Sequence, residues 1–177
     1  MPERASPLAQ EASAPGLSLR SCGLLLQYHG WPETYAELAA TITAQCGAAA
    51  APAPCKAVQG TSASLLRIHP QRLWLLSERA DAAGRPTIDP QLGAVLDLSH
   101  ARSIIRVADD AAEALLSRFI ALDLRRQHFA IDDVAITPLH RVSVVLWRRQ
   151  NCFDILAPRS FARSLWDLLA ETAERLG

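Results

Sequence analysis

The chain has 177 residues, half of them hydrophobic, and its 18 basic residues balance its 18 acidic ones to a formal net charge of zero. This length and composition are typical of one globular domain with a substantial core. The neutral balance argues against a nucleic-acid-binding surface, which needs an excess of basic residues, and no apolar run approaches the roughly 20 residues of a membrane span. We therefore expect neither nucleic acid nor membrane as a partner.

Residues 1–16 are rich in Ala, Ser and Pro, contain Glu3 and Glu11, and lack the apolar run of a signal peptide. We expect a flexible N-terminal tail over 1–16 and a single domain over 17–177. The four cysteines form no CxxC pair, so each is interpreted as a buried thiol in a reducing compartment, which favours a cytoplasmic location. They are Cys22, Cys46, Cys55 and Cys152.

The first half of the domain is expected to combine strands with one helix. Apolar residues recur at helical spacing after Pro32, and Gly47 ends the run. An Ala/Pro connector follows. The expected elements are a strand over 17–30, a helix from Pro32 to Cys46, strands over 64–70 and 72–78, and a loop over 79–92.

The second half contains more β-branched segments and two amphipathic helices. Asp109 and Asp110 are suited to cap the first helix, and Ser160 the second. The expected elements are strands over 94–99 and 102–108, a helix with apolar residues 111–119, a loop over 122–132, one bent strand or two strands over 134–149, a strand over 152–158, and a C-terminal helix with Phe161, Leu165, Leu168, Leu169, Thr172 and Leu176 on one face. Together they predict an α+β fold: a mostly antiparallel sheet with helices packed on one side.

Asp97, Ser99 and His100 are residue types of nucleophilic catalysis, but their arrangement does not favour it. A catalytic triad is assembled from distant segments, and its serine often sits on a GxSxG turn, which is absent here. On an extended chain Asp97 and Ser99 share a face, whereas His100 points away. We interpret Asp97 and Ser99 as side chains that hydrogen-bond the backbone at the end of a strand.

Metal and cofactor motifs are also missing. The sequence has no HExxH, no GxGxxG and no P-loop pattern. It therefore predicts no catalytic, cofactor-binding or metal-binding residue in this chain. Trp74, Trp147 and Trp166 are interpreted as core residues or interface anchors.

Two segments carry a family resemblance. DLSHARSIIRV, at 97–107, and FDILAPRSFARSLWDLL, at 153–169, together with AITPLHRVSVVLWRR between them, resemble the gamma subunit of heterotetrameric sarcosine oxidases. The resemblance extends over roughly residues 64–177. More distantly, DLSHARSIIRV followed by a helix and LDL is similar to the N-terminal segment of folate-dependent aminomethyltransferases; this chain has Ala108-Asp109-Asp110 where family members often carry a Gly-Pro turn.

The resemblance implies a fold like the first subdomain of aminomethyltransferase-type folate-binding domains. It also implies a role as a non-catalytic subunit of an oxidoreductase complex in sarcosine catabolism and one-carbon metabolism. This chain would contact the alpha subunit directly and share a heterotetramer with the beta and delta subunits. FAD, FMN, NAD and tetrahydrofolate would be bound by those partner subunits and none by this chain.

Two alternatives remain open at this stage: the equivalent subunit of a related complex, such as an N-methylglutamate dehydrogenase, and a stand-alone folate-binding protein. The segment 97–102 and the loop 122–132 are the expected contacts with the alpha subunit, because polar and forked donors gather there beside strand ends. The arginines could equally be solvated surface residues. The candidate partner contacts are Asp97, Ser99, His100, Arg102, Arg125, Arg126 and Arg159.

Overall fold

The computed structural model describes residue 14 and residues 16–20, 22–78 and 85–176, which form two antiparallel five-stranded sheets and three α-helices. The expected α+β class is confirmed, with two sheets in place of one. The described chain divides into two compact units: residues up to 20, 101–131 and 136–176 form the first, and residues 22–100 and 132–135 the second. The expectation of a single domain over 17–177 stays a prediction.

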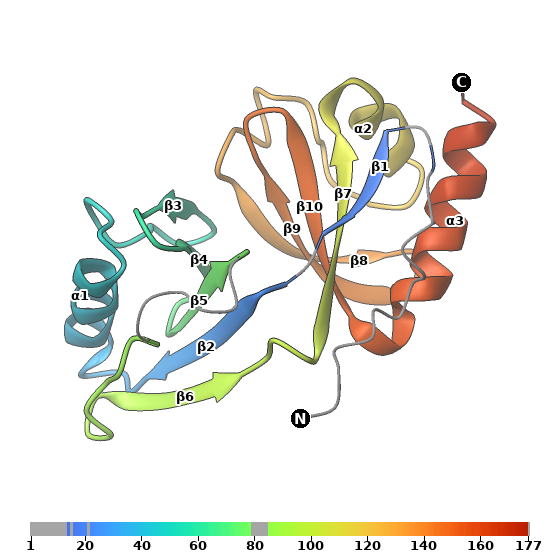
Figure 1. Cartoon of the computed structure of the whole chain (residues 1–177). Helices are drawn as coiled ribbons and strands as arrows, with labels where there is room; N and C mark the ends of the chain where they lie inside the picture. The colour runs from blue at the N-terminus through green and yellow to red at the C-terminus, as the bar shows by residue number, and fades with distance from the viewer. Residues whose placement is uncertain (1–13, 15, 21, 79–84, 177) are drawn as a thin grey trace. The chain divides into compact units, whose positions relative to one another are not determined.

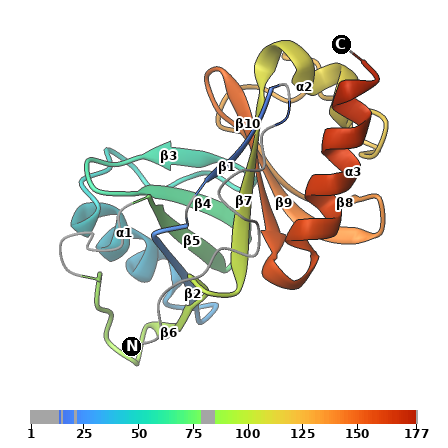
Figure 2. The same cartoon turned by 45° about the vertical axis from the view of Figure 1, so that its right-hand side comes forward.

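The first sheet has the order β1-β7-β10-β9-β8, and β7 and β10 are paired along seven residues. Helices α2 and α3 cover one of its faces (Figures 1 and 2). Most residues of β7 and β10 are buried; α2 contacts both strands and α3 contacts β7. The bounds are β1 Leu17–Arg20, β7 Arg102–Ala108, α2 Asp109–Leu116, β8 Val134–Leu139, β9 Val142–Arg148, β10 Cys152–Pro158, a 3-10 turn η1 Arg159–Phe161, and α3 Ala162–Glu174.

The second sheet has the order β3-β4-β5-β2-β6, with α1 packed against β2. Its elements are β2 Leu24–Gly30, α1 Tyr35–Gln45, β3 Ala57–Gln59, β4 Ser64–His69, β5 Arg72–Ser77 and β6 Gly93–Asp97. The core between sheet and helix is formed by Leu24, Leu26, Tyr28, Leu38, Ile42, Cys46, Leu65, Leu73 and Leu75. Gly93 must be a glycine, because a Cβ there would lie 2.2 Å from the His29 carbonyl oxygen.

Gly47 ends α1 as predicted. Its φ is +65°, and the N–H groups of Gly47 and Ala48 donate to the carbonyls of Ala44 and Thr43. This is the Schellman arrangement, which satisfies carbonyls left free at a helix end. At the other end α1 begins at Tyr35, three residues after Pro32, so the prediction of a helix start at Pro32 was too early.

The strand expected over 17–30 is two strands in different sheets. β1 pairs with β7 in the first sheet, whereas β2 pairs with β5 and β6 in the second. The sequence of a strand-forming segment does not reveal such a change of sheet, because it does not specify which distant strand becomes the neighbour. Of the tail expected over 1–16, the described part is a turn into β1, in which the Leu17 N–H donates to the Ala14 carbonyl; most of that tail lies outside the described residues.

The buried face of α3 differs from the predicted one by a small rotation. Ala162, Leu165, Trp166, Leu169 and Ala173 are buried, whereas Phe161 and Leu176 are exposed. The buried aromatic ring of Trp166 moves the centre of the apolar stripe. Trp74, Trp147 and Trp166 are all buried, which confirms their interpretation as core residues.

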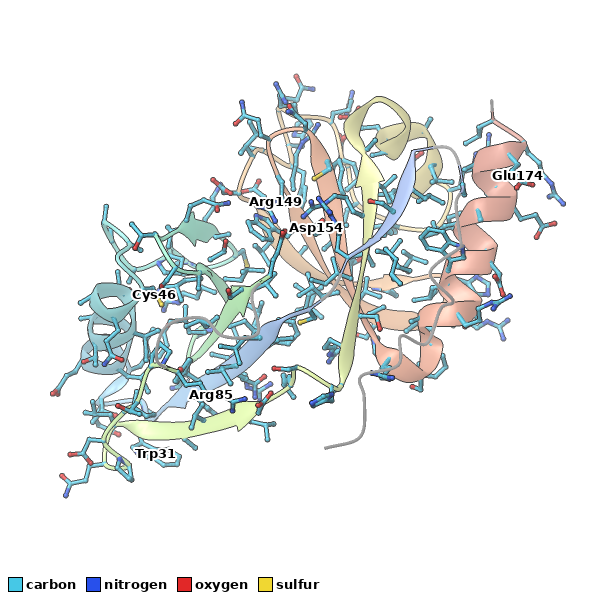
Figure 3. All side chains as sticks on the ribbon, in the orientation of Figure 1. Trp31, Cys46, Arg85, Arg149, Asp154 and Glu174 are labelled. Carbon is cyan, nitrogen blue, oxygen red and sulfur yellow. The ribbon has the colours of Figure 1, made fainter. Side chains whose placement is uncertain are left out.

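A buried carboxylate crosslinks three neighbouring segments of the first sheet. Asp154 of β10 has no exposed surface and accepts hydrogen bonds from Arg106 of β7, at 2.6 and 2.8 Å, and from Arg149 at 3.1 Å. Arg149 also lies over the Trp147 ring, with its guanidinium carbon 4.5 Å from the centroid. Figure 3 shows Arg149 and Asp154 next to each other. The two guanidinium groups replace the water that this carboxylate loses on folding.

Replacement of Asp154 by Asn should destabilise the first unit strongly. The substitution leaves two partly buried arginines without their carboxylate, which costs about 3–5 kcal/mol in comparable buried pairs. Asp167→Asn is the matched control, because Asp167 pairs with Arg163 on the exposed face of α3 and such pairs contribute under about 1 kcal/mol. Urea denaturation of both variants measures the difference; equal losses would contradict the buried-crosslink interpretation.

The four cysteines differ in burial, and burial raises the pKa of a thiol. Cys22 and Cys46 are buried as expected, whereas Cys55 is exposed and Cys152 half-buried. Cys55 lies in a turn with φ +59° ahead of β3, which places it outside the core. Burial raises the pKa of the Cys46 thiol from its ordinary 9.0 to about 11.

The second unit should therefore lose stability in alkali. Above pH 9.0 the unfolded thiol of Cys46 releases its proton while the folded thiol keeps it until about pH 11, so stability is full below this window and falls as the pH rises through it. Burial also raises the pKa of Tyr28, which acts in the same direction. Denaturant unfolding at several pH values should show a shallower decline for Cys46→Ala than for Cys55→Ala; identical slopes would show that Cys46 does not contribute.

Candidate partner interface

Ser99 fixes the turn that follows β6. Its hydroxyl oxygen accepts the N–H of Leu25 at 2.9 Å, and its own N–H donates to Oδ1 of Asp97 at 2.9 Å. Ser99 is buried, so its side chain supports the turn from inside. The expected role of Asp97 and Ser99 in bonding the backbone at a strand end is confirmed.

Asp97 is held as a carboxylate. Burial pushes the pKa of Asp97 upward, but the hydrogen bonds from Ser99 and from Arg85 outweigh it and hold the pKa below its ordinary value. The Arg85 guanidinium lies 2.7 Å from the carboxylate. A partner would therefore meet a carboxylate that is already paired, next to an exposed His100.

Ser99→Ala should lower stability, because it leaves the buried Leu25 N–H without an acceptor. The expected cost is about 1–3 kcal/mol in unfolding free energy. His100→Ala, one residue further on in the same turn, removes an exposed side chain and should change stability by less than about 0.5 kcal/mol. Thermal and urea unfolding of both variants provide the measurement, and an unaffected Ser99→Ala protein would refute the supporting role.

The loop 122–131 is built around a buried arginine from β9. Arg148 is 2 % exposed, and its Nη1 donates to the carbonyls of Leu124 at 2.6 Å and Phe129 at 3.1 Å. Its Nη2 lies 3.1 Å from the carboxylate of Glu113 on α2. The guanidinium also lies over the Phe153 ring, 4.8 Å from the centroid. One side chain thus joins the loop, the helix and the sheet.

The outer side of this loop presents charged side chains. Arg125 is exposed and forms an ion pair with Asp123, and this arginine lowers the pKa of Asp123 below its ordinary range. Arg126 is exposed as well, and its Nη2 donates to the Gln150 carbonyl at 3.3 Å. A turn in which the N–H groups of His128 and Phe129 both donate to the Arg125 carbonyl closes the loop. The two arginines are therefore displayed on an ordered backbone.

Arg102 and Arg159 lie together at the opposite end of β10. Arg102 pairs with Pro158 in the sheet register, and the Arg159 N–H donates to the Ala101 carbonyl at 2.9 Å. Both side chains are half-buried, and burial lowers the pKa of Arg102. The seven residues of β10 separate this pair from the loop by roughly 20 Å at a rise of ~3.3 Å per residue.

The predicted contact residues of the first unit therefore form two groups, one at each end of β10. Asp97, Ser99 and His100 belong to the second unit, whose long stretch ends at His100, and the chain returns to the first unit at Ala101. That these residues contact a partner stays a prediction. Sequence reasoning missed Arg148 and the Asp154 cluster; the signal was a charged residue inside an otherwise apolar strand, which a fold can bury only with a partner of opposite charge or with several hydrogen-bond acceptors.

The described residues contain no group of three or more His, Cys, Asp or Glu side chains placed to hold a metal ion. Within the same residues no helix combines the length and the apolar character needed to cross a bilayer.

Two solved structures share the fold of this chain. A chain of the heterotetrameric sarcosine oxidase from Corynebacterium sp. U-96, in complex with pyrrole 2-carboxylate, superposes with a TM-score of 0.73 at 23 % identity, over 90 % of this chain and 83 % of that one. Glycine cleavage system aminomethyltransferase T from Bartonella henselae matches with a TM-score of 0.57 at 15 % identity. That match covers 87 % of this chain and 45 % of the aminomethyltransferase. No protein-family model and no curated protein matches the sequence.

The fold resemblance expected from the sequence is confirmed by both matches. The sarcosine oxidase chain is nearly fully covered, whereas the aminomethyltransferase contains more than half of its length beyond the shared region.

Proposed function

We propose that this chain is the non-catalytic gamma-type subunit of a heterotetrameric flavoprotein that oxidatively demethylates sarcosine. The observation that carries the proposal is the match to a chain of a heterotetrameric sarcosine oxidase along almost the full length of both chains. Of the segments that resemble the gamma subunit, residues 102–107 and 153–169 lie in β7, β10, η1 and α3, so most of the resemblance lies in the first unit.

In this role the chain binds the alpha subunit, and the beta and delta subunits complete the complex. FAD, FMN and NAD belong to the partner subunits, as does tetrahydrofolate, which accepts the one-carbon unit. This chain contributes an ordered surface: the loop held by Arg148, with Arg125 and Arg126 on its outer side. Its location in the proposed complex is the cytoplasm.

A stand-alone folate-binding protein is the weaker proposal. This chain corresponds to 45 % of the aminomethyltransferase that it matches, and a pocket for a ligand as large as a folate must bury most of the ligand surface.

Co-expression with the adjacent reading frames tests the proposal. A tagged chain should co-purify with larger subunits in a yellow complex that oxidises sarcosine, whereas the chain purified alone should be colourless and inactive. N-methylglutamate assayed beside sarcosine distinguishes the related dehydrogenase complex. Folate binding or amine turnover by the isolated chain would overturn the subunit role.

Charge reversal should separate the contact loop from other exposed arginines. Arg125→Glu places a second acidic side chain beside Asp123 and should weaken association with the partner subunits by about tenfold or more, as expected for a contacting charge. Arg175→Glu is the matched control, because Arg175 is an exposed arginine directly after α3 that is paired with Glu171. Quantitative pull-down measures both; an Arg125→Glu chain that binds like the control would exclude the loop from the interface.

A further inference from the structure

Strand β6 forms one edge of the second sheet. It pairs with β2 through the register Leu26–Asp97 to Gly30–Gly93, and no other described strand pairs with it. In Figure 1 it runs along the margin of that sheet, next to β2. An edge strand presents a row of main-chain N–H and carbonyl groups that a further strand can bind.

The hydrogen bonds to β2 show which residues of this row face inward. The Leu98 N–H donates to the Leu25 carbonyl at 2.8 Å, and the Trp31 N–H donates to the Leu92 carbonyl at 3.2 Å. In an antiparallel pair, residues that exchange such bonds alternate with residues whose N–H and carbonyl groups point to the other side. The even-numbered residues from 92 to 98 therefore bond to β2.

The main-chain groups of Val95 and Asp97 accordingly point away from β2, toward the open edge. The β5 side of the same sheet supports this assignment, since the Gly30 N–H donates to the Gln71 carbonyl at 3.1 Å, so that the alternate residues of β2 bond to β5. The open edge thus offers a donor and an acceptor at each of two positions, spaced as the alternate residues of a strand.

The side chains of β6 are exposed on both faces of the sheet. Val95 is 51 % exposed and lies opposite Tyr28, on the face covered by α1. Leu96 is 55 % exposed and lies opposite Gln27, on the other face. Trp31, which follows the end of β2 and bonds to Leu92 just ahead of β6, is 44 % exposed and projects from the sheet in Figure 3. A strand added at this edge would place its side chains alternately on the two faces of the sheet, where they could contact the exposed apolar side chains of β6.

Within β6 itself, the lysine, proline and bulge that protect many natural edge strands are missing. The β6 sequence GAVLD has no lysine and no proline, and its register with β2 is continuous. Its one charged side chain, Asp97, is already paired with Arg85. The neutral, apolar edge therefore selects an uncharged partner segment.

We propose that β6 binds an extended apolar segment of the partner subunit, which adds as a sixth strand to the second sheet. The inference rests on the proposed function and specifies how the partner is held. A strand is the occupant because only an extended backbone can bond the Val95 and Asp97 groups in register. β6 ends at Asp97, the first residue of the predicted contact segment 97–102. A partner strand bound along β6 would therefore lie next to that segment.

Hydrogen exchange of single amides tests this directly. In the free chain the amides of Ala94 and Leu96 are protected by β2, whereas those of Val95 and Asp97 exchange fast. In the purified complex the Val95 and Asp97 amides should slow by about a hundredfold, while Ala94 and Leu96 change little. Unchanged exchange at Val95 and Asp97 in an intact complex would overturn the strand addition and leave the proposed function standing.

Two further outcomes are distinguishable. If no complex forms on co-expression, the proposed function fails and the strand addition fails with it. If the isolated chain forms dimers in which Val95 and Asp97 are protected, a second copy of this chain is the occupant, which overturns the assignment to a partner subunit.

Val95→Pro supplies the matched genetic test. Proline removes the outward N–H at this position without removing a bond to β2, so the isolated chain should keep its fold, checked by circular dichroism and thermal unfolding. Val95→Ala removes similar apolar bulk but keeps the N–H. We expect Val95→Pro to reduce co-purification at least about tenfold and Val95→Ala by much less; a folded Val95→Pro chain that co-purifies like the Val95→Ala chain contradicts the proposal.

Discussion

The hydrogen bonds of the buried Arg148 guanidinium hold loop 122–131 in place, and the charged outer side of that loop depends on them. Removing a cation from water costs several kcal/mol unless hydrogen bonds and opposite charge compensate. Here two loop carbonyls, the Glu113 carboxylate and the Phe153 ring supply that compensation. The loop backbone is thereby held to the sheet, and ordering it in advance lowers the entropy cost of binding a partner.

The same principle recurs in the centre of the first sheet. Asp154 is fully buried and is compensated by Arg106 and Arg149 from the neighbouring strand and from the hairpin that leads into β10. Buried charges of this kind tolerate little change, because the loss of one partner leaves the others unpaired. Both clusters place arginine inside the fold, so only part of the arginine content of the sequence serves the surface.

The sequence was sufficient for most elements and for the class of fold. Short apolar runs bounded by turn signals located β4, β5, β7 and β10 within a residue or so, and Gly47 ended α1 at the predicted position. The change of sheet between β1 and β2 was not predictable, because local pattern does not encode which distant strand becomes the neighbour. For the same reason the short strand β3 was missed.

The candidate contacts were predicted less well than the fold. Segment 97–102 proved to contain a buried Ser99 that supports the turn, and the arginines of the first unit fall into two separated groups. A polar residue beside a strand end looks the same in sequence whether it points inward or outward. The open edge of β6 was likewise hidden, because edge position depends on sheet order.

The matches cover 83 % of a sarcosine oxidase chain and 45 % of an aminomethyltransferase, so the fold is shared with nearly all of the first and with less than half of the second. In this account each unit presents one ordered surface: the buried Arg148 fixes loop 122–131 in the first unit, and the strand edge of β6 remains open in the second. Under the proposed function, reactivity belongs to the partner subunits.

The most direct measurement is the affinity of an Arg148→Lys chain for the purified partner subunits, read together with amide exchange in the loop 122–131 and in β10. A lysine keeps the charge but cannot reproduce the fork that reaches two carbonyls and Glu113. The account predicts fast exchange in the loop, preserved protection in β10 and binding weakened by about tenfold or more. Unchanged affinity in a chain whose loop exchanges fast would contradict it.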